Sequence, residues 1–283
     1  MASLRETKDR IGSVKSTLKI TSAMKLVASS KLRKAQRTIE SMRPYEEALT
    51  DILASLGSRA EYPAAALRED AAVAVVAISS NSSLCGAFNA NVIKRALAVA
   101  SQHPTVVVYP IGRRIADAMK KAGYDSREDY SELIGHPSYD LSCSLASELA
   151  SLYSEGKLSK IVLVYNHFVS TSHQELVEEI FLPFSTESIR KDDELTSCED
   201  FIVEPSAAEV AETLLPQVLM LRFHAAILDS AASEHAARTV AIQTATDNAK
   251  DLLGSLTLEY NKGRQQKITA EILDLLGGAS ANG

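Results

Sequence analysis

The chain has 283 residues, with 30 Lys and Arg against 36 Asp and Glu for a net charge of −6, and 46% of its residues are apolar. This composition excludes a disordered or collagen-like chain, and 12 glycines with 8 prolines are too few for the many turns of an all-β sandwich or barrel. The longest apolar run, Ala71 to Ile78, is far shorter than the about 20 residues of a membrane-spanning helix, so no direct membrane insertion is expected.

The first part of the chain carries a heptad pattern. Steps of alternately three and four residues reach fourteen positions, eleven of them apolar: Ile11, Val14, Leu18, Thr21, Lys25, Ala28, Leu32, Ala35, Ile39, Met42, Glu46, Leu49, Leu53 and Leu56. Such a seam predicts one long helix that packs against a partner helix. Pro44 predicts a kink rather than an end, and Gly57 and Pro63 end the stretch.

The same helix is strongly basic. Residues 1–43 hold eleven Lys and Arg against three acidic residues, a local charge of +8 that leaves −14 for the rest of the chain. A basic stripe suits phosphates or an acidic protein surface, and the first 44 residues contain no aromatic residue for stacking single-stranded nucleic acid. The alternative is a solvated helix face. A transit peptide is also basic and Ser-rich, but Glu6, Asp9 and the unbroken pattern favour a mature chain that begins near Met1.

The middle of the chain alternates strand and helix patterns. The β-branched runs are residues 71–79, 105–110 and 160–166, and the helical patterns are residues 88–102, 113–123 and 146–153, the last within a longer stretch. This alternation predicts a small Rossmann-like α/β domain with a mainly parallel sheet. Gln174 to Phe184 is a further, edge strand because Pro183 lacks a donor, and the polar residues 185–199 form a loop or linker.

No reaction centre is evident in this middle region. The loop Ser80 to Ala87 follows the first strand, but it matches neither dinucleotide nor P-loop motifs, so nucleotide binding is weakly supported. Cys85 has no histidine near it in sequence before His103, which favours a small buried cysteine over a nucleophile. The three cysteines form no CxxC pair and the six histidines show no ligand spacing on a helix face. We therefore predict no catalytic, cofactor-binding or metal-binding residue.

The C-terminal part repeats the heptad pattern. Its fourteen seam positions, again eleven apolar, are Leu214, Val218, Leu221, Ala225, Leu228, Ala232, His235, Thr239, Ile242, Thr246, Ala249, Leu253, Leu256 and Tyr260. A helix over Ser206 to Leu276 would be about 105 Å long, and its partner is expected to be the N-terminal helix, in an antiparallel coiled coil. The alternative is that each helix packs in a separate bundle. The predicted domains are thus residues 1–60, 71–200 and 206–283.

Three stretches at both ends and in the middle carry a family likeness. They are RETKDRIGSVKSTLKITSAMKLVASSKLRKAQ (Arg5 to Gln36), LCGAFN (Leu84 to Asn89) and the segment Ser233 to Ser280, whose ending holds Ile268, Thr269, Glu271, Gly277, Gly278 and Ala279. Together they make the chain resemble the γ subunit of F-type ATP synthases of the bacterial type.

The resemblance implies a central rotor shaft without catalysis of its own. Its partners would be a ring of three α and three β subunits, an ε-type subunit and the membrane c-ring, with no nucleic acid. Rotation driven by proton or sodium flow would be coupled to ATP synthesis or hydrolysis in the ring. Met24 matches the family methionine that faces a catalytic-subunit loop; the alternative for Met24, stronger than for Arg264, is that it fills the coiled coil. Arg264 and Gln265 match the Arg-Gln pair that hydrogen-bonds the ring.

Departures from the family pattern affect two expectations. Ser83 stands where many relatives have glycine, which leaves the conformation of the turn open. The cysteine-bearing insert of chloroplast members is absent, so a thiol switch is not predicted, and a peripheral place on the cytoplasmic side of a bacterial plasma membrane is favoured.

The competing functions are a nucleotide-dependent α/β protein with helical arms and a coiled-coil adaptor or nucleic-acid tether.

Overall fold

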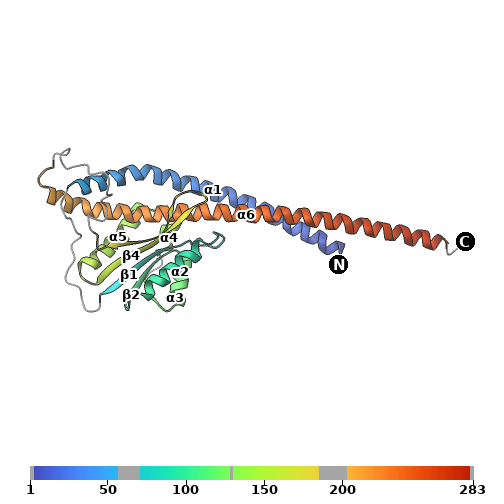
Figure 1. Ribbon diagram of the computed structural model, residues 1–283, viewed down its shortest axis with the longest axis horizontal. Helices are drawn as coiled ribbons and strands as arrows, with labels where there is room; N and C mark the ends of the chain where they lie inside the picture. Colours follow the sequence, from blue (N-terminus) through green and yellow to red (C-terminus); the bar gives the residue numbers. More distant parts are fainter. Residues whose placement is uncertain (1–2, 57–70, 128–129, 185–202, 281–283) are drawn as a thin grey trace. The chain divides into compact units, whose positions relative to one another are not determined.

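The computed structural model describes residues 3–56, 71–127, 130–184 and 203–280. Its elements are α1 (Leu4–Ser55), β1 (Ala72–Ile78), α2 (Phe88–Ser101), β2 (Val106–Ile111), α3 (Arg113–Lys121), β3 (Asp125–Ser126), α4 (Ser131–Gly135), α5 (Tyr139–Ser154), β4 (Leu158–Phe168), β5 (Gln174–Leu182) and α6 (Ala207–Ser280) (Figure 1). They form two compact units: the terminal helix pair, from residues 1–28 and 239–283, and the sheet unit, residues 29–238.

Both long helices begin with the same local device. At the start of α1 the Ser3 hydroxyl accepts from the Glu6 N–H at 3.2 Å, and the Glu6 carboxylate accepts from the Ser3 N–H at 2.9 Å. At the start of α6 the Ser206 hydroxyl accepts from the Glu209 N–H at 3.3 Å. Such Ser-x-x-Glu capping satisfies backbone donors that a helix start leaves unpaired. Each helix also runs through a proline, Pro44 in α1 and Pro216 in α6.

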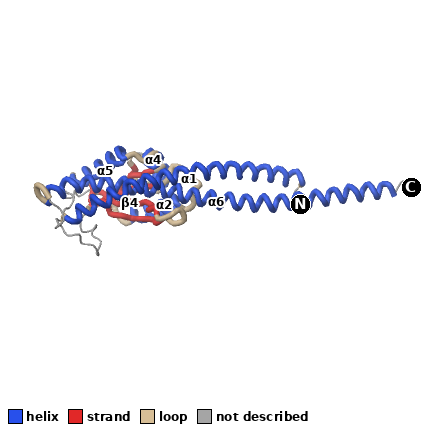
Figure 2. The backbone as a smooth tube through the Cα atoms, turned by 90° about the horizontal axis from the view of Figure 1, so that it is seen from above, coloured by secondary structure: helices blue, strands red, loops and turns tan. Residues whose placement is uncertain are grey.

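The predicted pairing of the two helices is confirmed. All twenty-eight predicted seam positions are buried or half-buried, including the polar Thr21, Lys25 and Glu46. In the sheet unit Leu32 and Ile39 of α1 share one apolar cluster with Leu228, Ala232 and Ala236 of α6. Lys31 of α1 lies near His235 of α6 and Arg43 lies near Asp229, so rising numbers on α1 meet falling numbers on α6 and the pair is antiparallel. Figure 2 shows the two long helices side by side. The separate-bundle alternative is wrong.

The sheet has the strand order β3-β2-β1-β4-β5. β1 pairs in parallel with β2 and with β4, and β2 pairs in parallel with β3. β5 is antiparallel to β4 and ends at Leu182, before Pro183, at the edge of the sheet as predicted. The predicted Rossmann-like, mainly parallel α/β fold is therefore confirmed.

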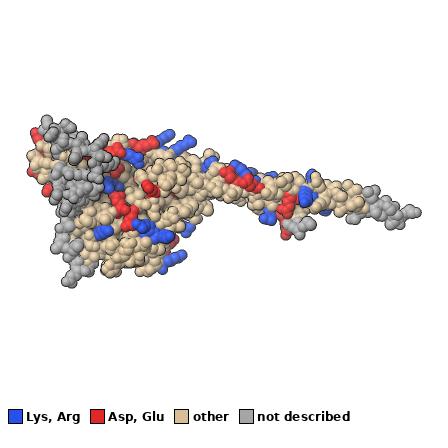
Figure 3. Space-filling view, viewed as in Figure 1, with Lys and Arg blue, Asp and Glu red and all other residues tan. Residues whose placement is uncertain are grey.

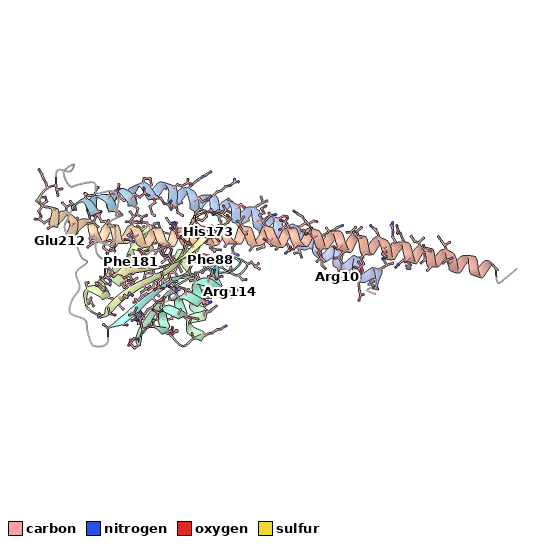
Figure 4. The ribbon with its side chains drawn as sticks, in the orientation of Figure 1. Arg10, Phe88, Arg114, His173, Phe181 and Glu212 are labelled. Atoms are coloured by element: carbon pink, nitrogen blue, oxygen red, sulfur yellow. The ribbon has the colours of Figure 1, made fainter. Side chains whose placement is uncertain are left out.

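Alternate residues of β1 feed two apolar layers. Val73, Val75 and Ala77 pack with α2 and α3 on one face of the sheet. Ala74, Val76 and Ile78 belong to a larger core that includes residues of α4, α5 and α6 and the end of α1. Phe181 of β5 lies against Phe223 of α6 with ring centroids 5.5 Å apart, and it is labelled on this side of the sheet in Figure 4. α6 is thus part of the sheet unit's core from Ala211 to Ala231.

Two short elements were not predicted. β3 consists of two residues that pair only with Val107 and Val108, and α4 has five residues. Neither is long enough to produce a periodic pattern, and only tertiary contacts reveal them. The helical pattern at residues 146–153, predicted within a longer stretch, lies in α5, which begins at Tyr139. The predicted linker of residues 185–199, including Cys198, lies outside the described residues. Within the described chain no helix is long and apolar enough to span a membrane.

Candidate partner-binding surface

The terminal helix pair leaves most of its surface open. Its buried side chains are Thr7, Ala28, Ile242, Thr246 and Leu256. Many apolar side chains are instead exposed, among them Leu26 (75%), Leu258 (73%) and Leu273 (62%). A contact with another chain would remove these apolar side chains from water.

The basic stripe predicted on α1 is accessible to solvent. Ten of the eleven Lys and Arg within residues 1–43 are exposed, and the other, Lys25, is half-buried. Figure 3 shows basic side chains along the long helices, and Arg10 is labelled on α1 in Figure 4. α6 of the terminal pair carries ion pairs of its own, Lys250–Asp247 at 3.1 Å and Lys267–Glu271 at 3.7 Å. An exposed stripe of one sign suits long-range attraction of an acidic partner.

Met24 lies half-buried on α1. Its neighbour Lys25 is close enough to Asp247 of α6 for a charge interaction, which fixes the level of Met24 along the helix pair. A half-buried methionine both fills a seam and presents its flexible side chain to a partner. The position therefore agrees with either role proposed for it.

Arg264 and Gln265 are both exposed on α6. They follow Gly263, where an added Cβ would lie 3.2 Å from Leu4 Cδ2 at the start of α1. The Gln265 carbonyl accepts from the Thr269 hydroxyl at 2.9 Å, so the backbone is regular helix here. The exposed guanidinium can pair bidentately with a carboxylate of another chain.

The structure does not bring these predicted residues together. Leu4 lies by Gly263 while Lys25 lies by Asp247, and α6 rises about 25 Å from Asp247 to Arg264. Met24 and the Arg264–Gln265 pair are therefore separate positions along the terminal helix pair. They are suited to different contacts rather than to one site.

The loop after β1 is hydrogen-bonded to the start of α3 in the same chain. The first backbone donors of α3 are used here: Arg113 N–H donates to Asn81 Oδ1 at 3.1 Å, Arg114 N–H to the Ser80 carbonyl at 3.2 Å and Ile115 N–H to Ser79 Oγ at 2.9 Å. Helix N-terminal N–H groups are what commonly hold a phosphate in such folds. These three are engaged within the chain and are available to a phosphate only after rearrangement.

Cys85 is buried beside this turn, as predicted. It is 1% exposed, and its Sγ accepts from Asn89 Nδ2 at 3.1 Å. Ser83 needs no glycine conformation, because the positive φ angles of the turn fall at Leu84 (67°) and Gly86 (60°). The described cysteines Cys85 and Cys143 are free thiols, and no group of three metal-ligating side chains occurs among the described residues.

Polar pairs that the sequence did not reveal join α6 to the sheet. His167 Nδ1 of β4 lies 2.6 Å from Asp229 Oδ2, and Arg222 donates to Glu179 of β5. Burial raises the pKa of Asp229 above its ordinary value, although the nearby His167 acts in the opposite direction. These residues are far apart in sequence, so no local spacing could have indicated the pairs. They add partly buried polar contacts between α6 and the sheet.

Known proteins resemble the chain over nearly all of its length. The family model described as ATP synthase matches residues 3–281. The ATP synthase gamma chain of Bacteroides fragilis is 48% identical over 290 residues, covering 99% of this chain and 100% of that protein. The ATP synthase gamma chain of Christiangramia forsetii is 42% identical over 288 residues, covering 99% of each.

A solved structure shares the fold. It is a chain of the Euglena gracilis mitochondrial ATP synthase, OSCP/F1/c-ring, in rotational state 3, with a TM-score of 0.68 and 20% sequence identity. The match covers 98% of this chain and 94% of that chain.

Proposed function

The chain belongs to the ATP synthase gamma chain family, and on that premise we propose that it is the central rotor of an F-type ATP synthase. As a gamma chain it is a non-catalytic subunit. The observation that carries the rotor role is the antiparallel pairing of α1 and α6 along a buried seam, with exposed basic and apolar side chains outside it. Two mutually supporting helices resist bending, which a single exposed helix does not.

The partners proposed are those of a rotary complex. A ring of three α and three β subunits surrounds the helix pair, and an ε-type subunit and the membrane c-ring connect the chain to the ion-driven motor. Helices of residues 1–60 and 206–283 supply the shaft, and residues 71–200 form a domain beside it. The complex lies on the cytoplasmic side of a bacterial plasma membrane as a peripheral F1 part, which the Bacteroides and Christiangramia relatives support.

Rotation couples to chemistry through differential contact. The surface of the helix pair is not uniform, because exposed Arg and Lys, exposed Leu and Ile, and acidic residues alternate around it. Each orientation of the shaft therefore offers a different contact free energy to each catalytic subunit. A change of state can be driven only by such a difference.

Three side chains are proposed as contacts in this scheme. Arg264 forms charge-assisted hydrogen bonds to a ring carboxylate, and Gln265 beside it supplies an amide donor and acceptor. Met24 faces a loop of a catalytic subunit at another level of the shaft. Their exposure on α6 and half-burial on α1 support these roles.

Purification of the chain from its own membranes tests the proposal. A tag on the full chain is expected to recover the α and β subunits in equal number together with an ε-type subunit and the c-ring. ATP hydrolysis is expected in the recovered complex and not in the chain alone. Recovery of the chain without a hexameric ATPase would overturn the rotor function.

A further inference from the structure

The turn between β1 and α2 presents a strained, exposed residue. Leu84 has a φ angle of 67° and is 64% exposed. A non-glycine residue in this region of backbone space is uncommon and persists only where surrounding contacts hold it. The neighbouring Asn81, Ser82 and Ser83 are exposed as well, so apolar burial does not hold residues 81–84 of this turn.

Hydrogen bonds of the Asn89 and Ser80 side chains hold the base of the turn. Asn89 Oδ1 accepts from the Ser80 N–H at 3.0 Å, and Asn89 Nδ2 donates to the Ser82 carbonyl at 3.2 Å. These bonds close the turn on the first helical turn of α2. These bonds do not involve the Ser82 hydroxyl or the Ser83 carbonyl.

Arg238 of α6 donates hydrogen bonds to both of these groups. Its Nη1 donates to the Ser83 carbonyl at 2.5 Å and its Nη2 donates to Ser82 Oγ at 2.9 Å. The two partners lie 155 and 156 residues away in sequence. A guanidinium can make such a two-point contact because its donors have a fixed planar geometry, which an ammonium lacks.

Glu234 orients the guanidinium from one helical turn away. Its Oε1 accepts from Arg238 Nε at 2.9 Å and from Nη2 at 2.6 Å. The side chains of Arg238 and Glu234 are only 13% and 9% exposed. Burial of an ion pair costs desolvation free energy that solvent-exposed pairs do not incur. An ion pair between residues i and i+4 that served only to stabilise the helix could remain exposed to solvent.

We propose that Arg238 is a positioning residue that latches the Ser80–Gly86 turn to α6. Glu234 fixes its direction, and the latch makes the exposed turn move as one body with the helix. This consequence rests on the proposed rotor function: torque carried by α6 reaches the turn and the sheet without slip. Loss of the latch removes the contact of the turn with α6 and leaves it attached through β1, α2 and the hydrogen bonds of Ser80 and Asn81 to the start of α3.

The buried thiol of Cys85 reports the state of the turn directly. In the full chain with Cys143→Ser and Cys198→Ser, Cys85 is the only thiol, and its rate of maleimide labelling measures opening of the turn. Arg238→Ala is expected to raise that rate about tenfold or more, since two bonds to a charged group are lost. Arg238→Lys is also expected to raise it, because charge alone does not restore the two-point contact.

Matched variants make the result decisive. Lys250→Ala removes one positive charge from the exposed face of the same helix and is expected to leave the labelling rate unchanged. Ser82→Ala removes one acceptor from an exposed residue and is expected to raise the rate about threefold, so it decides the matter if Arg238→Ala does not fold. A wild-type labelling rate in Arg238→Ala, or in Ser82→Ala in that event, overturns the latch.

A second readout separates the latch from the rotor function. In everted membrane vesicles carrying the whole complex, Arg238→Ala is expected to lower ATP-driven ion pumping per ATP hydrolysed at least twofold, while hydrolysis persists. Faster labelling with unchanged pumping would keep the latch and reject its role in torque transfer. Failure of the chain to co-purify with an ATPase would reject the rotor function, whereas the labelling result would stand.

Discussion

Single residues of the terminal helix pair differ in what their positions allow. Arg264 is exposed on α6 and contributes nothing visible to the packing of the pair. Met24 is half-buried in the seam, so a substitution there changes both packing and any partner contact. Arg264 is therefore the cleaner test of a contact role.

We expect Arg264→Ala to lower rotation-coupled ATP synthesis of the assembled complex about tenfold, because the proposed bidentate charged contact to the ring would be lost. The far-UV circular dichroism and the free energy of unfolding of the chain should not change. Synthesis by reconstituted vesicles measures the effect, with Lys262→Ala, two residues away and also exposed, as control. Synthesis at the wild-type rate in Arg264→Ala would remove this residue from the contact.

A buried histidine gives the chain a pH-dependent stability. His224 of α6 is 6% exposed, its Nδ1 lies 2.9 Å from Ser142 Oγ of α5, and Tyr139 packs edge-on against its ring at 5.4 Å. Burial lowers the pKa of His224 below its ordinary 6.5. The folded state then binds fewer protons than the unfolded state, so stability is complete above pH 6.5 and is lost as the pH falls through the lowered pKa.

His224→Leu removes this dependence of stability on proton binding and places an apolar side chain of similar size at the buried position. Ser142 retains the Ser138 carbonyl as its acceptor at 2.7 Å. Below pH 6.5 the wild type should lose free energy of unfolding relative to the variant, with a slope of at most about 1.4 kcal/mol per pH unit. Urea unfolding at pH 5 and at pH 7.5 measures the difference. Parallel pH profiles of the two proteins would contradict the assignment.

At the scale of elements, the sheet depends on one close backbone approach. Gly112 joins β2 to α3 with a φ angle of 111°, and a Cβ there would lie 2.2 Å from the Ser79 carbonyl oxygen. That carbonyl belongs to the backbone that continues into the β1–α2 turn. The atom that an added Cβ would meet is therefore a backbone atom, which cannot rotate away as a side-chain atom can.

Gly112→Ala is expected to destabilise the chain by about 3 kcal/mol or more, through the steric conflict added to the unfavourable φ angle. Gly123→Ala is the matched control, because its φ angle is 83° and nothing lies within 4 Å of the added Cβ. The control should cost only about 1 kcal/mol. Equal losses for the two variants in urea unfolding would show that the close approach to Ser79 is unimportant.

At the scale of the whole molecule, the chain has a Rossmann-like sheet in which side chains at the end of β1 and in the loop after it use the backbone donors at the start of α3. Asn81 and Ser79 engage the Arg113 and Ile115 N–H groups at the start of α3. We expect the isolated full chain to show no ATP binding at micromolar concentration and no hydrolysis, as a rotor that leaves nucleotide chemistry to its partners. Isothermal titration calorimetry with Mg-ATP measures this. Micromolar affinity would favour the nucleotide-dependent alternative instead.

The periodic features of this protein were determined by the sequence itself. Each heptad position from Ile11 to Leu56 became buried or half-buried, because a 3.5-residue apolar repeat leaves a helix one way to remove its seam from water. The β-branched runs became β1, β2 and β4, because pairing in a sheet also removes their apolar side chains from water. Pro183 marked β5 as the edge strand. The exposed Arg264 was found from the family resemblance and not from periodicity.

Only the tertiary structure decided which distant polar groups meet. Arg238 reaches Ser82 and Ser83 across more than 150 residues, and His167 reaches Asp229 across 62. A hydrogen bond depends on distance and direction in space and leaves no periodic trace in the chain. The sequence could therefore determine where apolar surface is buried, while folding alone determined which charged and polar side chains fasten α6 to the sheet and the turn.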